Sequence, residues 1–186
     1  GNIQDICETI YNDTENFPMP EDVYLGMDII EHAYNYFKEN GSSLSNESED
    51  IRKKTLTAFA LPKNIAGLER DLAKYRITYD NWFKESTLHN DGSVNEIIQK
   101  LKASGYTYEQ DGALWFKSSQ LGDEKDRVLI RANGVVTYFV PDIAYHYNKL
   151  VTRGYDKAID IFGADHHGYI PRMKAALTAL GVDANK

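Results

Sequence analysis

The sequence has little of what several large protein classes require. Cys7 is the only cysteine among 186 residues, which excludes an internal disulfide framework and any zinc site built from several cysteines. No apolar run approaches the ~20 residues that a membrane-spanning helix needs. The first 20 residues carry acids and asparagine rather than the basic head and apolar stretch of a secretory signal. An initiator methionine is also missing, and we expect Gly1 to mark a cut in a longer protein.

Positive charge is scarce as well. The chain has 21 basic and 28 acidic residues, so its formal net charge is −7. A surface of this sign does not attract polyanions as a whole, and any contact with nucleic acid must be local or made by other segments. What remains, 42% hydrophobic and 26% charged residues, is the composition of a folded domain long enough to bury a core. A single thiol fits a reducing compartment, and we expect a cytoplasmic protein.

The first half of the chain is predicted to be mostly helical. A short helix is expected over residues 3–12, and a clear amphipathic one over 23–39 ends at Asn40-Gly41. Its apolar side chains recur at helical spacing: Val23, Met27, Ile30, Tyr34 and Phe37. Two more helices are expected over about 50–60 and 64–75, separated by Pro62, followed by a strand over 77–83.

A small α+β module is predicted in the middle. Ser93 and Glu96 form a capping box at the start of a helix that stops at Gly105. Asp111-Gly112 and Asn133-Gly134 are typical of hairpin turns, because both residue pairs tolerate positive φ. The β runs that flank these turns cover 106–109, 113–117, 128–131 and 135–140. We expect residues 92–134 to form an insertion with antiparallel hairpins.

In the last part of the chain, the spacing of apolar residues changes from that of strands to that of helices. A helix over 142–153 is expected after Pro141, then a short buried strand over 158–162 and a helix over 170–180. Alternation of helix and strand along the chain is typical of a layered α/β fold. The expected fold class is therefore α/β, with residues 1–91 and 135–186 framing the insertion.

The densest group of chemically useful residues is Gly163-Ala-Asp-His-His-Gly168, between the expected strand and the last helix. Ligands of α/β sheets bind where strands end and helices begin. The alternative is a plain turn in which Asp165 caps the helix. We expect no metal, because the adjacent His166 and His167 point to different sides. The triplet Asp165-His166-His167 also suggests manganese phosphoesterases, but the further Asp-x-Asp which that chemistry needs does not occur.

A second candidate group is Tyr138-Phe-Val-Pro-Asp142. Tyr138 and Asp142 could hold a cationic or hydroxylated ligand. Alternatively, Asp142 complements the helix dipole, for ~0.3–1 kcal/mol, and Tyr138 belongs to the core.

Four runs together resemble the catalytic domain of arginyl-tRNA synthetase, a class I aminoacyl-tRNA synthetase. They are Asp111-Gly-Ala-Leu-Trp-Phe116, Asp123-Glu-Lys-Asp-Arg-Val128, Thr137-Tyr-Phe-Val-Pro-Asp-Ile-Ala-Tyr-His146 and Ile161-Phe-Gly-Ala-Asp-His-His-Gly-Tyr-Ile-Pro-Arg172. Tyr24-x-Gly26 and Tyr79-Asp80 agree with it, so the resemblance covers essentially the whole chain. It implies a partial nucleotide-binding, Rossmann-like domain with a small inserted module.

The resemblance also implies substrates and site residues. Tyr138, Asp142 and His166 match positions at the L-arginine, and Gly163, Asp165 and His167 match the loop beside ATP. ATP, with magnesium as its counter-ion, and tRNA are the implied partners, with no metal held by the protein and no membrane.

The two ATP signatures of class I enzymes, His-x-Gly-His and Lys-Met-Ser-Lys, do not occur in the 186 residues. Family order places them upstream of Gly1 and downstream of Lys186. We therefore expect an arginine–tRNA ligase fragment that has no catalytic residue of its own and is inactive alone. The alternative is a non-catalytic module that binds arginine or a nucleotide.

Overall fold

The computed structural model describes residues 26–163, 166 and 168–186. The helix expected over 3–12 lies outside these residues. The chain divides into two units, Gly1–Asp80 and Asn81–Lys186, and each is described by itself.

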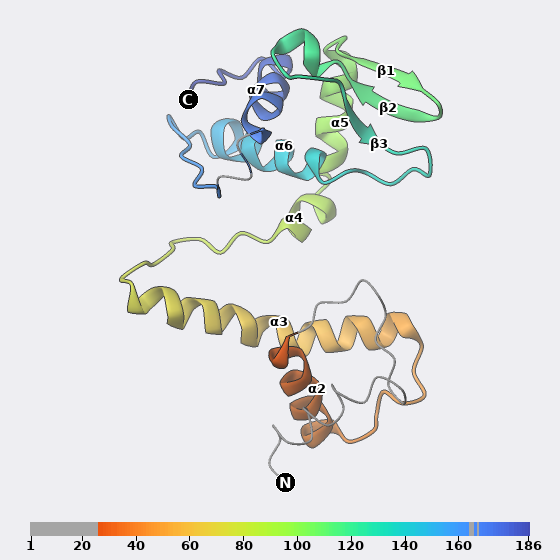
Figure 1. Cartoon of the computed structure of the whole chain (residues 1–186), viewed down its shortest axis with the longest axis vertical. Helices are drawn as coiled ribbons and strands as arrows, with labels where there is room; N and C mark the ends of the chain where they lie inside the picture. The colour runs from red at the N-terminus through yellow and green to blue at the C-terminus, as the bar shows by residue number, and fades with distance from the viewer. Residues whose placement is uncertain (1–25, 164–165, 167) are drawn as a thin grey trace. The chain divides into compact units, whose positions relative to one another are not determined.

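The first unit contains two helices, α2 (Met27–Asn40) and α3 (Glu49–Lys74), which contact each other (Figure 1). The Oγ of Ser48 accepts a hydrogen bond from the amide of Ile51 at 3.4 Å, so the predicted start of α3 is confirmed. Between the helices, the rings of Tyr36 and Phe59 meet edge to face at 5.1 Å. Neither helix has a fully buried residue.

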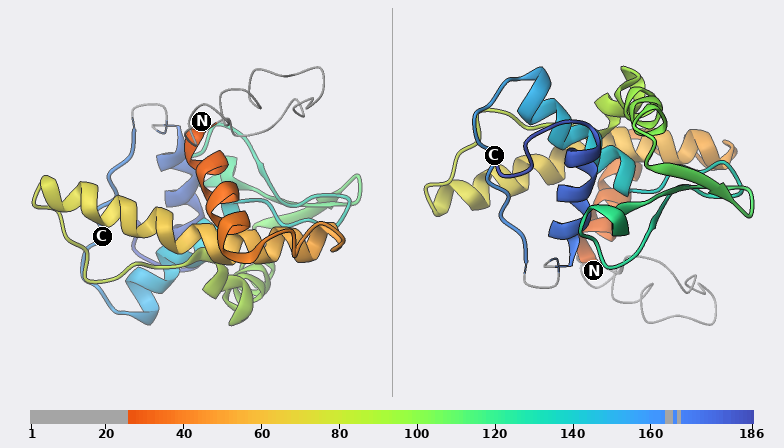
Figure 2. Two further views of the ribbon diagram at one scale, coloured as in Figure 1. Left: turned by 90° about the horizontal axis from the view of Figure 1, so that it is seen from below. Right: turned by 90° about the horizontal axis from the view of Figure 1, so that it is seen from above.

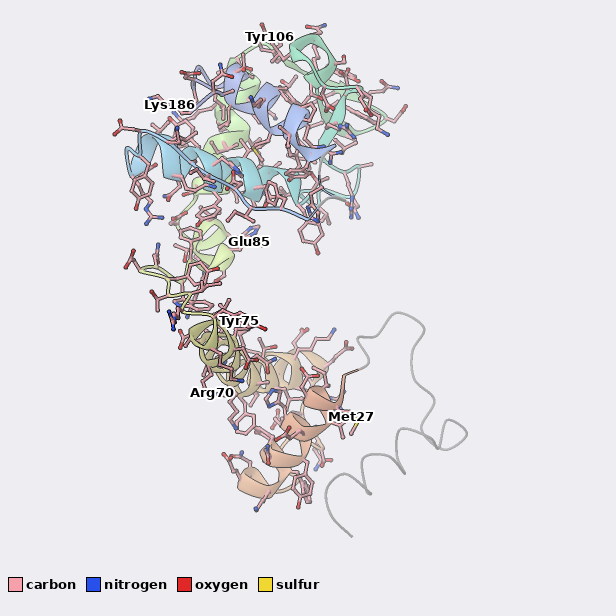
Figure 3. The ribbon with its side chains drawn as sticks, turned by 60° about the vertical axis from the view of Figure 1, so that its left-hand side comes forward. Met27, Arg70, Tyr75, Glu85, Tyr106 and Lys186 are labelled. Atoms are coloured by element: carbon pink, nitrogen blue, oxygen red, sulfur yellow. The ribbon has the colours of Figure 1, made fainter. Side chains whose placement is uncertain are left out.

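Two predictions for this part were wrong. The helices expected over 50–60 and 64–75 are one continuous helix, with Pro62 inside it. Pro62 removes one backbone hydrogen bond, but α3 continues through it over all of its 26 residues. The strand expected over 77–83 is not formed: this stretch has no strand partner among the described residues and runs as an extended connection between Tyr75 and Glu85 (Figure 3).

The second unit combines helices with one small sheet, which lies at one side of the unit in Figures 1 and 2, with α6 and α7 at the other. The helices are α4 (Glu85–Asn90), α5 (Ser93–Ala103), α6 (Phe139–Tyr147) and α7 (Tyr169–Ala179). The strands are β1 (Thr107–Gln110), β2 (Ala113–Phe116) and β3 (Arg127–Ile130). A 3-10 turn, η1 (Ser118–Leu121), follows β2, and a π-helical turn, η2 (Asn148–Thr152), continues α6.

The sheet is antiparallel in the order β1-β2-β3. The first predicted hairpin is confirmed: Asp111 and Gly112 both have positive φ, 51° and 73°, between the paired strands β1 and β2. The second is formed only in part, through an isolated bridge between Ile130 and Val136. Phe139 and Val140, expected in a strand, belong to α6, because both are buried on its core-facing side.

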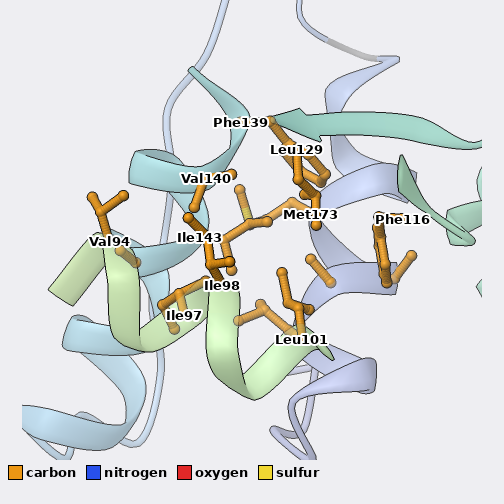
Figure 4. Close-up of a cluster of buried hydrophobic side chains, with 14 of the residues drawn as sticks. Val94, Ile97, Ile98, Leu101, Phe116, Leu129, Phe139, Val140, Ile143 and Met173 are labelled. Atoms are coloured by element: carbon orange, nitrogen blue, oxygen red, sulfur yellow. The ribbon is translucent and has the colours of Figure 1, made fainter. Parts of the chain in front are cut away.

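The hydrophobic core of this unit joins α5, the sheet, α6 and α7 (Figure 4). Helix α5 buries the apolar face that its sequence predicts, namely Val94, Ile97, Ile98 and Leu101. The predicted capping box is wrong. Gly92, with φ of 84°, is the N-cap, and the carboxylate of Asp91 accepts from the amide of Ser93 at 2.9 Å.

The buried strand expected over 158–162 is also wrong. This stretch has no regular structure, and Ile159 and Ile161 are 79% and 95% exposed. A strand forms only beside a partner that takes up its backbone hydrogen bonds. In the described part of the chain none lies there, and Ala158 instead donates to the carbonyl of Lys186 at 3.0 Å. Helix α7 is found as predicted.

Candidate functional site

Tyr138 and Asp142 come from the beginning of α6. Tyr138 is the N-cap residue, and its side chain is 81% exposed. Asp142 lies in the first turn and is half-buried, and its amide donates to the carbonyl of Tyr138 at 3.3 Å. The positive end of the helix dipole favours a carboxylate at this place.

Tyr169, the first residue of α7, contacts Asp142 from a second helix. Its hydroxyl donates a hydrogen bond to the Oδ2 of Asp142. Burial, followed by this contact with Asp142, holds the pKa of the Tyr169 phenol far above its ordinary value, so the hydroxyl keeps its proton and acts as a donor. Sequence analysis gave Tyr169 no role. Its position directly after Gly168, at the start of a helix, was the available signal.

His146 lies one helical turn after Asp142 on α6 and is 8% exposed. Its Nδ1 lies 2.8 Å from the backbone carbonyl of Asp142, and its Nε2 lies 2.8 Å from a carboxylate oxygen of Asp160. A backbone carbonyl can only accept, so Nδ1 is the donor in the first of these contacts. Lys149 also contacts Asp160, with its Nζ 2.5 Å from the other carboxylate oxygen.

The carboxyl of Asp160 has a lowered pKa. Burial alone would raise the pKa of its carboxyl, but the hydrogen bond from Lys149 and the charge and hydrogen bond of His146 outweigh burial and lower it. This cluster ties the irregular stretch 158–162 to α6. It was not predicted from the sequence, because the partners His146 and Asp160 are 14 positions apart and belong to different elements.

Only part of the glycine–histidine loop is described. His166 is exposed, its amide donates to the carbonyl of Gly163 at 3.0 Å, and its ring stacks on Phe162 at 5.7 Å. Phe162 in turn meets the ring of Tyr169 edge to face at 6.4 Å. Asp165 and His167 lie outside the described residues. The structure thus connects His166 to Asp142 through Phe162 and Tyr169.

A cavity of about 230 Å³ lies next to this connection. Its wall includes His146, Asp160, Phe162 and Tyr169, together with apolar residues of α7 such as Met173 and Leu177. Tyr138, Asp142 and His166 are not among the lining residues. Tyr169, which contacts Asp142, and Phe162, which stacks on His166, thus also line this mainly apolar cavity.

Among the described residues, no three His, Cys, Asp or Glu side chains come together as they would around a metal ion. Likewise, none of the helices described is long and apolar enough to span a bilayer.

Comparison with known proteins gives consistent matches. The 50% identical arginine–tRNA ligase of Acetivibrio thermocellus aligns over 167 residues, which are 90% of this chain and 30% of the relative. The arginine–tRNA ligase of Bacillus subtilis is 46% identical over 166 residues, or 89% of this chain and 30% of the relative. The chain thus spans about 30% of the length of the curated relatives it matches.

Solved structures agree. A chain from Campylobacter jejuni, described as an arginyl-tRNA synthetase, superimposes with a TM-score of 0.83 at 39% identity, over 98% of this chain and 39% of that one. The arginyl-tRNA synthetase of Thermus thermophilus, at 19% identity and a TM-score of 0.55, shares the fold. The expected α/β fold class, that of a class I synthetase catalytic domain, is confirmed. The family model for the catalytic domain of class I (R) tRNA synthetases matches residues 2–185, and the chain belongs to this family.

Proposed function

We propose that the protein containing this chain is an arginine–tRNA ligase, and that the chain supplies part of its arginine-binding site. The observation that carries the proposal is the half-buried carboxylate of Asp142 at the positive end of α6, oriented by the hydroxyl of Tyr169. The arginine–tRNA ligases that match at 44–50% identity support it.

The chemistry of Asp142 suits a guanidinium. A guanidinium is planar and always charged, and it presents parallel N–H donors that a carboxylate can accept in pairs. A carboxylate offers about four lone-pair directions, and Tyr169 uses one of them, so a paired interaction still fits. The exposed ring of Tyr138, one helical turn before Asp142, is placed to cover the aliphatic part of the substrate.

The glycine–histidine loop is assigned to the other substrates. We propose that His166 faces the arginine, and that Gly163, Asp165 and His167 approach ATP. Magnesium would enter with the ATP phosphates, and we assign it no ligand in this chain. Attack of the arginine carboxylate on the α-phosphate releases pyrophosphate, and the activated arginine is then transferred to tRNA. Such chemistry depends on positioning and on stabilising charge.

The domain organisation follows from this proposal. Residues 92–134, which contain α5 and the three strands, would be a module inserted between two parts of a catalytic domain, 1–91 and 135–186. We also propose a cytoplasmic location, where tRNA is charged.

The test is ATP–pyrophosphate exchange by the full-length protein, with each of the amino acids, in the presence and absence of tRNA. Exchange that depends on arginine, and on no other amino acid, is the expected result. The alternative is a non-catalytic module that binds arginine or a nucleotide. It predicts binding of arginine without exchange, and a full-length reading frame that lacks a Lys-Met-Ser-Lys signature.

A further inference from the structure

We infer that Tyr169 is a positioning residue for arginine recognition: its hydroxyl fixes the orientation of the Asp142 carboxylate, and it links that carboxylate to the stretch that carries His166. The inference rests on the proposed function, and it assigns a role to a residue that contacts Asp142 and also lines the neighbouring cavity.

The first observation is the hydrogen bond itself. The Tyr169 hydroxyl donates to Oδ2 of Asp142, across 27 residues of sequence and between the first turns of α6 and α7. A carboxylate on a short side chain rotates freely unless a partner holds one of its oxygens. With one lone pair of Oδ2 engaged, the plane of the carboxylate is set before a substrate arrives, which reduces the ordering cost of binding.

The second observation is that the Tyr169 ring is itself fixed from three sides. Phe139 of α6 meets it edge to face at 6.1 Å, Phe162 does so at 6.4 Å, and the guanidinium of Arg172 lies over it at 4.9 Å. A donor on a ring held in this way can transmit its position to an acceptor. A hydroxyl on a mobile side chain could not.

The third observation concerns the backbone carbonyl of Asp142. One ring nitrogen of His146 lies at hydrogen-bond distance from the backbone carbonyl of Asp142, and the other from Asp160, which belongs to the same stretch as Phe162. Residues 158–162 therefore reach Asp142 along two routes, through Phe162 and Tyr169 to the side chain and through His146 to the backbone. A displacement of residues 158–162, which precede His166, would therefore alter the position of the Asp142 carboxylate.

The charges around Tyr169 are consistent with its acting as a donor. Asp142 faces it from α6, and Arg172 faces it from α7. Burial and the neighbouring carboxylate hold the pKa of Tyr169 well above its ordinary value, so the hydroxyl stays protonated throughout the pH range in which the enzyme would work.

The experiment uses the full-length protein and measures arginine-dependent ATP–pyrophosphate exchange in the presence of tRNA. Tyr169→Phe keeps the ring and its three neighbours and removes only the hydroxyl. We expect the KM for arginine to rise roughly tenfold, as for the loss of one hydrogen bond to a charged group. The KM for ATP, and kcat at saturating arginine, should stay within about twofold, because these do not depend on the orientation of Asp142.

The matched control is Tyr145→Phe. Tyr145 lies on α6, the helix that carries Asp142, and its ring stacks on Phe83 at 4.4 Å, so this variant removes a hydroxyl from another packed tyrosine close to Asp142 in the sequence. This variant should leave all three kinetic constants unchanged. An equal rise in the KM for arginine in both variants would overturn the inference.

A double-mutant cycle separates positioning from a purely structural role. If Tyr169 acts through Asp142, Tyr169→Phe should add nothing to the arginine KM of Asp142→Ala, a variant that leaves the Tyr169 hydroxyl no side-chain acceptor at position 142. Effects that multiply would overturn the inference, as would an unchanged KM for arginine in Tyr169→Phe. If Tyr169→Phe proves unstable in thermal melts, 3-fluorotyrosine at position 169 keeps ring and hydroxyl but changes the strength of the donor. The arginine KM must then move while the ATP KM does not, and a constant arginine KM would overturn the inference.

Failure of the proposed function gives a different result. A wild-type protein without arginine-dependent exchange overturns that function, and the inference with it. An active wild type whose Tyr169→Phe variant keeps its arginine KM overturns the inference alone.

Discussion

At the scale of single residues, Asp142 has two explanations that make different predictions. A carboxylate in the first turn of a helix stabilises that helix whatever else it does, for ~0.3–1 kcal/mol. A carboxylate that also receives a guanidinium takes part in a charge-assisted pair, which is worth more and is felt only when arginine is present. Its half-buried position and its contact with Tyr169 are compatible with both.

Asp142→Asn distinguishes the two explanations. The asparagine keeps the size of the side chain and an acceptor for Tyr169, but it loses the charge. We expect the full-length protein to need roughly 10- to 150-fold more arginine, which corresponds to the ~1.5–3 kcal/mol of a hydrogen bond to a charged group. The KM for ATP should change little. Steady-state exchange kinetics at varied arginine and at varied ATP measure both constants, and an unaltered arginine KM would leave Asp142 with the helix-dipole role alone.

Sequence reasoning identified residue types in local runs but not their distant partners. Tyr138 and Asp142 stand four positions apart, so the sequence grouped them, but it expected Tyr138 at the end of a strand and not at the N-cap of α6. The partners of Asp142 and His146, namely Tyr169 and Asp160, lie 27 and 14 positions away and are brought in by packing between elements. No local pattern predicts such a pair.

At the scale of elements, periodicity predicted the helices well and the strands less well. The apolar face of α5 and the Asp111-Gly112 turn are properties of a few adjacent residues, and both were found. The stretch 158–162 differs, because a strand depends on a neighbour that the local sequence does not contain. The strand expected over 135–140 failed for a related reason: burial of Phe139 and Val140 against the core favours the start of α6.

The loop between β2 and β3 depends on one buried ion pair. Arg127 donates from Nε and Nη2 to the two carboxylate oxygens of Asp123, both at 2.7 Å, and the Asp123 side chain is only 1% exposed. The amide of Glu124 donates to the same carboxylate at 2.8 Å, so the pair also fixes the backbone of the loop. Removing one partner of such a pair leaves the other charge buried and uncompensated.

We expect Asp123→Asn to lower the free energy of unfolding by about 3 kcal/mol or more, as for other broken buried pairs. Glu124→Gln is the matched control, since it removes one negative charge from an exposed neighbour, and it should cost little. Urea unfolding followed by circular dichroism measures both. Equal losses in the two variants would contradict a special role for the buried pair.

The same pair predicts a pH dependence. The hydrogen bond from Arg127 outweighs burial and lowers the pKa of Asp123 in the folded state. Its contribution to stability is therefore fully present above the unfolded pKa of about 3.9, and it is lost as pH falls through the lower, folded value. Unfolding curves between pH 3 and 7 should fall more steeply in acid for the wild type than for Asp123→Asn. Parallel curves would contradict this prediction.

At the scale of the whole molecule, the two units differ in how much they bury. Among the described residues, the hydrophobic core lies in the second unit, whereas α2 and α3 have no fully buried residue and leave Met27, Phe37, Leu61 and Leu68 largely exposed. Local opening costs least where few apolar side chains are buried. Amides of α2 and α3 should therefore exchange with deuterium much faster than those of α5, α6 and α7.

Hydrogen exchange followed by mass spectrometry measures this difference on the 186-residue chain. The experiment should be repeated at several protein concentrations, because self-association could cover the exposed side chains and slow exchange. Protection of α2 and α3 equal to that of α5 at every concentration would contradict the prediction.

The activity of the 186-residue chain by itself provides the last prediction. It contains neither His-x-Gly-His nor Lys-Met-Ser-Lys, the signatures through which class I synthetases stabilise charge on ATP. In the proposed site Asp142 and Tyr169 orient the arginine, but orientation without charge stabilisation at the α-phosphate leaves most of the barrier in place. We expect no measurable arginine-dependent ATP–pyrophosphate exchange from the purified chain, with or without tRNA, under conditions in which the full-length protein is active. Robust exchange by the chain alone would contradict this prediction, because it would show that the groups acting on ATP lie within these residues. The candidates would then be the loop from Gly163 to Gly168 and Lys149 beside Asp160.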